Sequence, residues 1–238
     1  MAEPVYRSIV AGFKGVFASL GLRFDIQGAD KLPMTGGAVL AINHTSYLDF
    51  ALAGIPADRR GRRLVRFMAK QSVFRHRVSG PLMRAMKHIP VDRSAGSQAF
   101  DVAVQALQAG ELVGVFPEAT MSRSMDIKPI KSGAVRMAMD AGVPLFPMAV
   151  LGGARIYSYG YRSLSRGKSI VITIGDPMHI QPGDDIDAAT SELRDRMRGA
   201  LDASVARYPD ASGAWFIPAR LGGSAPAPDD VGEGEPVG

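Results

Sequence analysis

Two short polar segments of the sequence carry side chains that could move a proton. The first is Asn43-His44-Thr45-Ser46-Tyr47-Leu48-Asp49, which follows an apolar run and places a histidine five positions before a carboxylate. The second is Phe116-Pro117-Glu118-Ala119-Thr120, which closes another apolar run and places a carboxylate in a predicted turn. Polar turns at strand ends are where α/β enzymes keep their reactive groups. The two segments together therefore indicate an enzyme site.

Asp49 has two compatible interpretations. Ser46 and Asp49 have the spacing of a capping box, in which the acid supports the first turn of a helix. In that geometry His44 lies in the turn before the helix, close enough for the Asp49 carboxylate to hold one imidazole nitrogen. The other nitrogen is then free to take a proton, and the carboxylate stabilises the imidazolium that forms. We predict His44 as a general base and Asp49 as its orienting acid.

Other kinds of site have less support in the sequence. His76, His88 and His179 show no ligand spacing with the pair, and the chain has no cysteine, so no metal site is expected. The lack of cysteine also excludes a covalent thiol intermediate and any disulfide. The sequence has no Gly-x-Ser-x-Gly elbow, no Gly-x-Gly-x-x-Gly fingerprint and no Walker A loop, which argues against a serine hydrolase of that design and against nucleotide cofactors.

Strand patterns alternate with helical patterns through most of the chain. Predicted strands cover residues 22–27, 38–42, 64–69, 112–116, 143–151 and 169–174, and helical spacing marks residues 100–107, 134–139 and 186–208. The alternation predicts a single α/β domain with a mixed, mostly parallel sheet flanked by helices. Pro144 and Pro147 favour an edge or a strand start, over a central strand, for residues 143–151.

The two ends of the chain differ from this middle part. After Pro4, apolar residues recur at helical spacing as far as Leu20, with Arg7 and Lys14 on another face. Such a helix either packs its stripe on the core or lies in a membrane interface, and we predict residues 1–21 as a membrane-docking helix. Residues 22–210 form the predicted catalytic domain. Residues 211–238, rich in glycine, proline and acids, are predicted to be a largely disordered extension.

Basic residues are unevenly distributed along the sequence. The formal net charge is +5, and between Arg59 and Arg93 eleven bases meet a single acid, Asp92. Such a field favours an anionic partner, either a lipid surface or a phosphorylated substrate. Nucleic acid is not expected, because no aromatic interleaving or nucleic-acid motif accompanies the bases. Neither a signal peptide nor a membrane-spanning segment is expected, since no run approaches 18 apolar residues.

Four sequence blocks, taken in order, resemble those of the 1-acyl-sn-glycerol-3-phosphate acyltransferases. Residues 43–49 match Asn-His-x4-Asp, Ile89-Pro90-Val91-Asp92-Arg93 matches the second block, residues 116–120 match Phe-Pro-Glu-Gly-Thr, and Val143-Pro144-Leu145-Phe146-Pro147 matches the fourth. The similar stretch runs from about residue 25 to 180. It departs from the family at Ala119, where glycine is usual, and at Met121, where arginine is common.

The resemblance implies transfer of a fatty acyl chain from an acyl thioester to the free hydroxyl of lysophosphatidic acid, giving phosphatidic acid for phospholipid synthesis. His44 would be the base, and Arg93 would hold the phosphate of the acceptor. The other substrate-binding residues would be Glu118, Thr120, Arg123 and Lys131, and Arg123, Lys128 and Lys131 are near enough in sequence to replace the missing arginine. Acyl-CoA or acyl carrier protein would be the co-substrate, and no cofactor is expected.

Two alternatives remain open from the sequence. The same chemistry could act on another lysophospholipid or on a glycolipid, which the departure at Met121 favours. A non-catalytic lipid-binding protein could use only the amphipathic helix and the basic segment. The main expectation is a peripheral enzyme at the cytoplasmic face of the cell membrane, in contact with anionic lipids.

Overall fold

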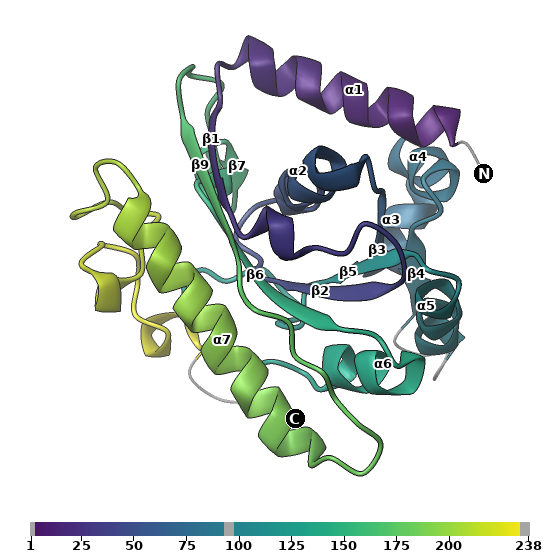
Figure 1. Cartoon of the computed structure of the whole chain (residues 1–238). Coiled ribbons are helices and arrows are strands. Elements are labelled where there is room, and N and C mark those ends of the chain that lie inside the picture. The colour runs from purple at the N-terminus through teal and green to yellow at the C-terminus, as the bar shows by residue number, and fades with distance from the viewer. Residues whose placement is uncertain (1–2, 93–97, 234–238) are drawn as a thin grey trace.

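The fold is built on one large sheet in a computed structural model that describes residues 3–92 and 98–233 (Figure 1). Its seven strands have the order β1-β9-β6-β2-β5-β3-β4. They are β1 (Arg23–Gln27), β2 (Ala38–Ile42), β3 (Val65–Lys70), β4 (Ile89–Val91), β5 (Leu112–Val115), β6 (Leu145–Leu151) and β9 (Ser169–Ile174). Neighbouring strands are parallel except β6 and β9, which pair antiparallel. The expected α/β fold with a mixed, mostly parallel sheet is confirmed.

Helices cover both faces of the sheet, as Figure 1 shows. On one face lie α1 (Pro4–Ser19) and α2 (Asp49–Gly61), and on the other α5 (Gln98–Gln108), α6 (Gly133–Ala141) and α7 (Ile186–Arg207). Short elements complete the fold: α3 (Gln71–Arg75), α4 (Ser79–Ala85), β7 (Tyr157–Ser158), β8 (Tyr161–Arg162) and the 3-10 turns η1 (Ala29–Lys31), η2 (Gly153–Arg155), η3 (Ala219–Leu221) and η4 (Asp229–Val231). Because both faces are covered, the central strands are continuous apolar runs.

The prolines of residues 143–151 favoured an edge or a strand start over a central strand, but β6 is central in the sheet, between β2 and β9. The edge position was wrong, whereas Pro144 lies directly before the start of β6. Pro147 is tolerated in β6 because of where it lies relative to β9. Pairing between β6 and β9 begins only at Met148 opposite Ile174. Pro147 accepts a hydrogen bond from the Gly175 N–H at 2.9 Å, just beyond the end of β9. Its missing N–H therefore falls at the end of the ladder to β9 instead of in its middle.

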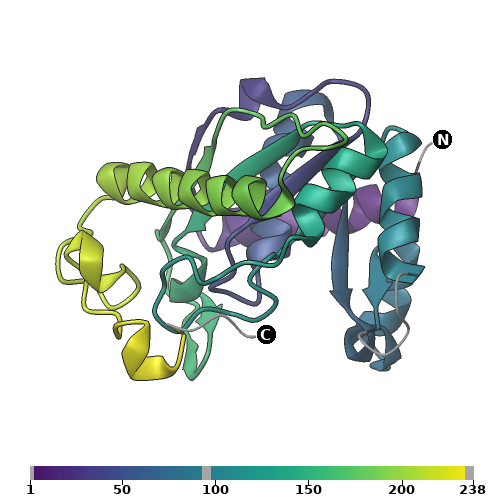
Figure 2. The same cartoon turned by 90° about the horizontal axis from the view of Figure 1, so that it is seen from below.

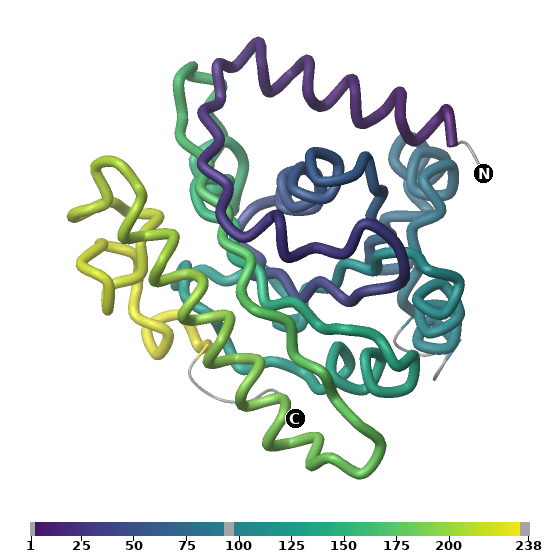
Figure 3. Tube along the Cα trace, in the orientation of Figure 1, coloured from purple at the N-terminus to yellow at the C-terminus, as the bar shows by residue number. Residues whose placement is uncertain are grey.

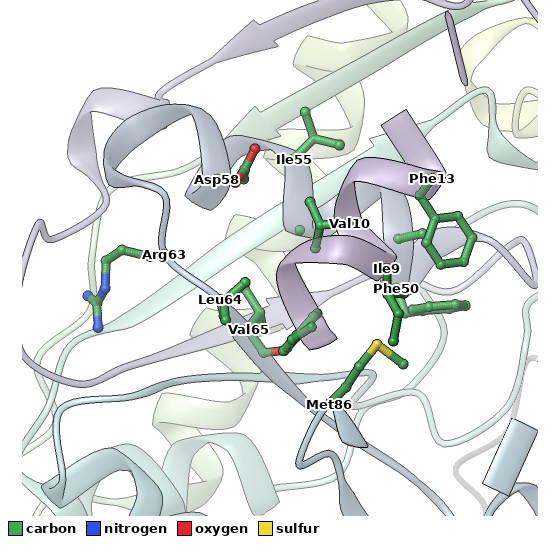
Figure 4. A pocket seen from close by; sticks show the side chains of 13 residues that line it. Ile9, Val10, Phe13, Phe50, Ile55, Asp58, Arg63, Leu64, Val65 and Met86 are labelled. Carbon is green, nitrogen blue, oxygen red and sulfur yellow. The ribbon is translucent and has the colours of Figure 1, made fainter. Parts of the chain in front are cut away.

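The apolar stripe of α1 packs on the domain. Tyr6 and Phe17 are buried, and the Tyr6 hydroxyl donates to the Val65 carbonyl at 2.6 Å. Lys14 is paired with Asp58 of α2 at 2.8 Å. Figure 4 shows side chains of α1 facing those of α2 and β3 around a small apolar pocket. Membrane docking by residues 1–21 remains a prediction, and none of the described helices combines the length and apolarity that crossing a bilayer requires.

The described part of the C-terminal extension, residues 211–233, is folded, which corrects the expectation of disorder there. Figure 2 shows this segment leaving the end of α7 and turning back toward the body of the domain, and the tube in Figure 3 follows the same path. Phe216, Ile217 and Ala225 are buried in the core cluster that also contains α7. The composition of this segment, rich in acids, glycines and prolines, predicted disorder, but these three apolar residues dock it on the domain. The free energy gained by burying them stabilises the folded segment.

Candidate active site

Three neighbouring strands, β5, β2 and β6, run parallel and end at one edge of the sheet. His44 follows β2, and Glu118 follows β5. The backbone N–H of His44 donates to Glu118 Oε1 at 3.0 Å, and the Ser122 N–H donates to the His44 carbonyl at 2.7 Å. The structure therefore brings the two polar segments together at the carboxyl edge of the sheet, where α/β folds place their sites.

The turn that carries His44 is fixed by hydrogen bonds to β6 and to the chain that follows it. The Asn43 side chain accepts from the Val150 N–H at 2.7 Å and donates to the Val150 carbonyl at 3.2 Å, so it extends the sheet ladder beyond β2. Ser46 Oγ donates to the Tyr157 carbonyl at 2.7 Å, and Ser158 Oγ donates to the Thr45 carbonyl at 2.6 Å. The histidine is thus held on a rigid turn, as a positioned base requires.

His44 and Asp49 form the predicted contact. His44 Nδ1 lies 3.1 Å from Asp49 Oδ2, and the ring keeps 24% of its side chain exposed. With Nδ1–H donating to the carboxylate, Nε2 carries the lone pair that can accept a proton. The site geometry thus allows His44 to act as a base toward a bound hydroxyl.

Asp49 is held from several sides. Its Oδ2 also accepts the N–H groups of Thr45 and Ser46, both at 2.7 Å. The residue is completely buried, and burial raises the pKa of its carboxyl although the hydrogen bonds from His44, Ser46 and Thr45 act in the opposite direction. Gly153 leaves room for it, because a Cβ at that position would lie 3.0 Å from Asp49 Oδ1.

The capping box forms only in part. Helix α2 begins at Asp49, and the carboxylate reaches back to the Ser46 N–H as the acid of a capping box does. Ser46 Oγ, however, accepts from the Leu48 N–H at 3.1 Å instead of capping the first turn of the helix. The orienting and helix-starting roles of Asp49 therefore coexist in one carboxylate.

An aromatic wall lies behind the His44 ring. The Phe116 ring is stacked on His44 with ring centres 4.3 Å apart. The Phe67 ring centre lies 6.1 Å from that of Phe116, and the Phe50 ring centre lies 6.1 Å from that of Phe67. Phe13 of α1 follows, with its ring centre 5.7 Å from that of Phe50, so this row of rings runs from His44 to the pocket under α1. This wall gives the site an apolar side and fixes the plane of the imidazole.

Glu118 points inward in the structure. Its Oε1 accepts from the His44 N–H, and its Oε2 accepts from the Lys128 N–H at 3.2 Å. Burial raises the pKa of this carboxyl to about 8, against the lowering effect of the Lys128 and His44 N–H groups. The contacts are those of a residue that positions His44, whereas the sequence suggested one that touches substrate.

The cations after Glu118 occupy different places. Lys128 is buried, and its ammonium donates to Thr120 Oγ1 and to the Met121 carbonyl. Arg123 is exposed, with its guanidinium carbon 5.0 Å from the centre of the Tyr159 ring. The exposed Lys131 is tied to the site only through its N–H, which donates to the Pro117 carbonyl at 3.0 Å. Of the three cations expected to replace the missing arginine, Lys128 is therefore the one whose ammonium contacts the turn after Glu118.

Arg93 and Thr120 are also among the residues predicted to bind substrate. Arg93, the predicted phosphate ligand, lies outside the described residues. Thr120 is exposed beside Lys128, and its substrate contact remains a prediction. Within residues 3–92 and 98–233, no three histidine, aspartate or glutamate side chains gather as a metal site would require.

The chain is similar in sequence to known proteins. A family model described as Acyltransferase matches residues 23–151, more than half of the chain. The chain is also 30% identical over 168 residues to the 1-acyl-sn-glycerol-3-phosphate acyltransferase of Bacillus subtilis, a match that covers 69% of this chain and 78% of that protein. The chain belongs to this acyltransferase family. The chloroplastic 1-acyl-sn-glycerol-3-phosphate acyltransferase of Arabidopsis thaliana is 25% identical over 209 residues, covering 84% of this chain and 56% of its own.

A solved structure of the same description supports the fold. The crystal structure of the 1-acyl-sn-glycerophosphate acyltransferase from Thermotoga maritima matches with a TM-score of 0.70 at 20% identity, covering 86% of this chain and 81% of that one. The plant relatives are longer proteins, and the chain spans about half of their length. The acyltransferase family expected from the four sequence blocks is confirmed.

The departure of this acyltransferase from its family at Ala119 has a structural meaning. Ala119 has a φ of 61°, in the left-handed region that favours glycine. The turn after Glu118 thus requires the conformation that the usual glycine adopts without strain, and this chain adopts it with a Cβ. Met121, at the other departure, is buried, so the arginine common there is replaced by a packed apolar side chain.

Proposed function

We propose that this acyltransferase moves a fatty acyl chain from an acyl thioester to the free hydroxyl of lysophosphatidic acid and so forms phosphatidic acid. The observation that carries the proposal is the His44–Asp49 pair, joined at 3.1 Å beside an aromatic wall at the carboxyl edge of the sheet. The names of the Bacillus subtilis and Arabidopsis thaliana relatives support lysophosphatidic acid as the acceptor.

The reaction needs only one proton carrier from the protein. A thiol has a pKa of roughly 8.5 and leaves a thioester readily, whereas a hydroxyl, with a pKa roughly that of water at 15.7, needs a base before it attacks. His44 Nε2 takes the hydroxyl proton as the oxygen attacks the thioester carbonyl carbon. Asp49 Oδ2 stabilises the resulting imidazolium, and the tetrahedral intermediate collapses with release of the thiolate, which takes a proton from His44. Because the chain has no cysteine, the attack is direct, with both substrates bound.

A second acceptor class is favoured by one observation. Met121 is buried where the family commonly carries an arginine, so a phosphate has one fixed cation fewer beside Thr120. Lys128 supplies a cation there instead. If Lys128 does not suffice for a phosphate monoester, the same base would serve a lysophospholipid of another head group or a glycolipid.

A peripheral position on an anionic membrane is part of the proposal. The α3–α4 hairpin exposes Val73, Val78 and Leu82, and the exposed Arg75 and Arg77 lie beside them in sequence. Apolar side chains flanked by bases suit the boundary between head groups and acyl chains, and each base near an anionic surface contributes about 1 kcal/mol. The bases of α1 suit this role less, since Lys14 is paired with Asp58. The hairpin is therefore our candidate for lipid contact on the cytoplasmic face.

The function is tested by incubating the purified protein with acyl-CoA and lysophosphatidic acid and measuring the intact mass of the lipid product. Parallel reactions replace the acceptor with lysophosphatidylcholine or a glycolipid, and the donor with acyl carrier protein. We expect phosphatidic acid as the main product. A product from another acceptor alone would move the assignment to the second class, and no product from any pair would contradict the acyltransferase role.

A further inference from the structure

Three hydrogen-bond donors and one ammonium group converge on one carboxylate beside the active site. Glu233, near the C-terminus, accepts from the Arg123 N–H at 2.7 Å, from the Ser124 N–H at 3.1 Å and from Ser122 Oγ at 3.2 Å. The Lys128 ammonium lies 4.0 Å from Glu233 Oε1, the oxygen that also accepts from the Arg123 N–H. These donors come from the loop after Glu118, about a hundred residues earlier in the chain, and we name residues 122–128 the anion loop.

Buried side chains and hydrogen bonds hold the anion loop in shape. Ser122 and Ser124 are buried and joined through their hydroxyls at 3.0 Å. Lys128 is 9% exposed, and Thr120 holds its ammonium in place. The side chain of Glu233 is likewise 9% exposed. Successive backbone N–H groups with a hydroxyl and an ammonium form a concave anion site, and a phosphate oxygen takes the same donors as a carboxylate oxygen.

The carboxylate of Glu233 is charged in this position. Burial on its own would raise the pKa of this carboxyl, but the N–H groups of Arg123 and Ser124, with Lys128, bring it below its ordinary value. Its negative charge in turn helps raise the pKa of Glu118. The anion loop therefore holds a full negative charge next to the residue that positions the base.

The anion loop is also joined directly to the catalytic turn. The Ser122 N–H donates to the His44 carbonyl at 2.7 Å, and the Lys128 N–H donates to Glu118, which in turn accepts from His44. An anion in the loop is thus separated from the backbone of the base by a single residue. The proposed acceptor carries both the hydroxyl that His44 deprotonates and a phosphate, so the two sites are placed as such a molecule needs.

We propose that Glu233 is an internal competitor that fills the anion loop, and that the phosphate of the acyl acceptor enters this loop only when the C-terminal end moves away. The competition of Glu233 with a phosphate stands on the loop geometry, and the identity of the phosphate carrier rests on the proposed function. Since Glu233 belongs to the same chain, its local concentration at the loop is high. The apparent affinity of the loop for a phosphate is its intrinsic affinity multiplied by the fraction of time that Glu233 leaves the loop open.

The first test measures phosphate binding without using enzyme activity. The thermal unfolding midpoint of the full chain is followed as inorganic phosphate is added, for the wild type, for Glu233→Ala and for Asp229→Ala, which removes an exposed acid of the same segment. We expect phosphate to raise the midpoint of Glu233→Ala by about 2–4 °C and to leave the wild type and Asp229→Ala almost unchanged. The double variant Glu233→Ala with Lys128→Met should lose this response. Equal responses of the wild type and Glu233→Ala would overturn the proposal.

The second test uses acyl transfer. Glu233→Ala should lower the apparent KM for lysophosphatidic acid roughly three- to tenfold, without lowering the KM for the acyl thioester, while Asp229→Ala matches the wild type. Glu233→Gln should behave like Glu233→Ala, because it keeps the shape and removes the charge. An unchanged KM for the acceptor in both variants would overturn competition for the acceptor. If no variant transfers an acyl group but phosphate still stabilises Glu233→Ala, the proposed function fails and the anion site stands.

Discussion

At the scale of single residues, Asp49 links the fold to the chemistry. One oxygen of its carboxylate accepts two backbone N–H groups and faces His44 Nδ1, at distances of 2.7, 2.7 and 3.1 Å. An amide could place its oxygen where Oδ2 lies, but it carries no negative charge to stabilise the imidazolium that forms when His44 takes a proton. We expect Asp49→Asn to lower kcat roughly 10²- to 10⁴-fold in steady-state assays at saturating substrate. Asp58→Asn, which removes another carboxylate of α2, is the matched control, and equal activity of the two variants would contradict the orienting role.

Ala119 provides a second prediction at this scale. Its φ of 61° costs about 1 kcal/mol or more for a residue with a Cβ. Glycine adopts this conformation without the clash but loses more backbone freedom on folding, by roughly 0.5–1 kcal/mol. We therefore expect Ala119→Gly to stabilise the protein by about 0.5 kcal/mol, seen as a higher urea midpoint. Destabilisation would mean that the Cβ of Ala119 contributes more through packing than it costs in strain.

The sequence predicted part of the site and missed the rest for identifiable reasons. His44 and Asp49 are close in sequence, so spacing and helix geometry were enough to predict their contact. Glu118 was recognised, but its inward orientation depends on the N–H groups of His44 and Lys128, which only the folded loop presents. Glu233 contacts residues about 110 positions away, and no local pattern marks such a pair.

At the level of helices and strands, the sequence pattern predicted an element correctly where a single physical effect, such as burial of an apolar run, decided its structure. Apolar runs located β2 and β9 at residues 38–42 and 169–174 as predicted. The prolines of residues 143–151 favoured an edge or a strand start over a central strand, whereas Pro147 lies inside the central strand β6, where its pairing with β9 ends. The C-terminal segment was judged by its acids and glycines, although three apolar residues within it were enough to dock it.

The docking of this segment can be measured. Phe216 is 6% exposed and packs on Tyr208 with ring centres 5.2 Å apart, while the neighbouring Trp215 is 36% exposed. We expect Phe216→Ala to lower the free energy of unfolding by about 3–5 kcal/mol in urea denaturation, and Trp215→Ala to lower it by less than half as much. A disordered segment would give no loss from either substitution.

At the scale of the whole molecule, a buried histidine makes stability depend on pH. His88 accepts from the Phe67 N–H at 3.1 Å, and burial, with the nearby Arg66, lowers its pKa to about 4. Above pH 6.5 the histidine is neutral in both the folded and the unfolded chain. As pH falls from 6.5 toward 4, the unfolded chain binds a proton that the folded chain does not, so stability is lost over this window.

We expect His88 to account for about 2 kcal/mol of the stability lost between pH 7 and pH 5. In His88→Gln the amide oxygen can still accept the Phe67 N–H but does not titrate, so the pH-dependent loss should shrink by that amount in urea denaturation. His179→Gln, at an exposed histidine, should keep the loss of the wild type. A loss in His88→Gln as large as in the wild type would contradict the assignment.

His44 lies at the carboxyl edge of the sheet, where its ring is stacked on Phe116 of the aromatic wall and its carbonyl accepts from Ser122 of the anion loop. The most direct test of the account is the rate of phosphatidic acid formation from acyl-CoA and lysophosphatidic acid by His44→Ala, with His179→Ala as control and thermal unfolding to confirm that both variants are folded. We predict that kcat of His44→Ala falls roughly 10²- to 10⁴-fold while His179→Ala matches the wild type. A folded His44→Ala protein that forms phosphatidic acid at a rate near that of the wild type would contradict the central claim.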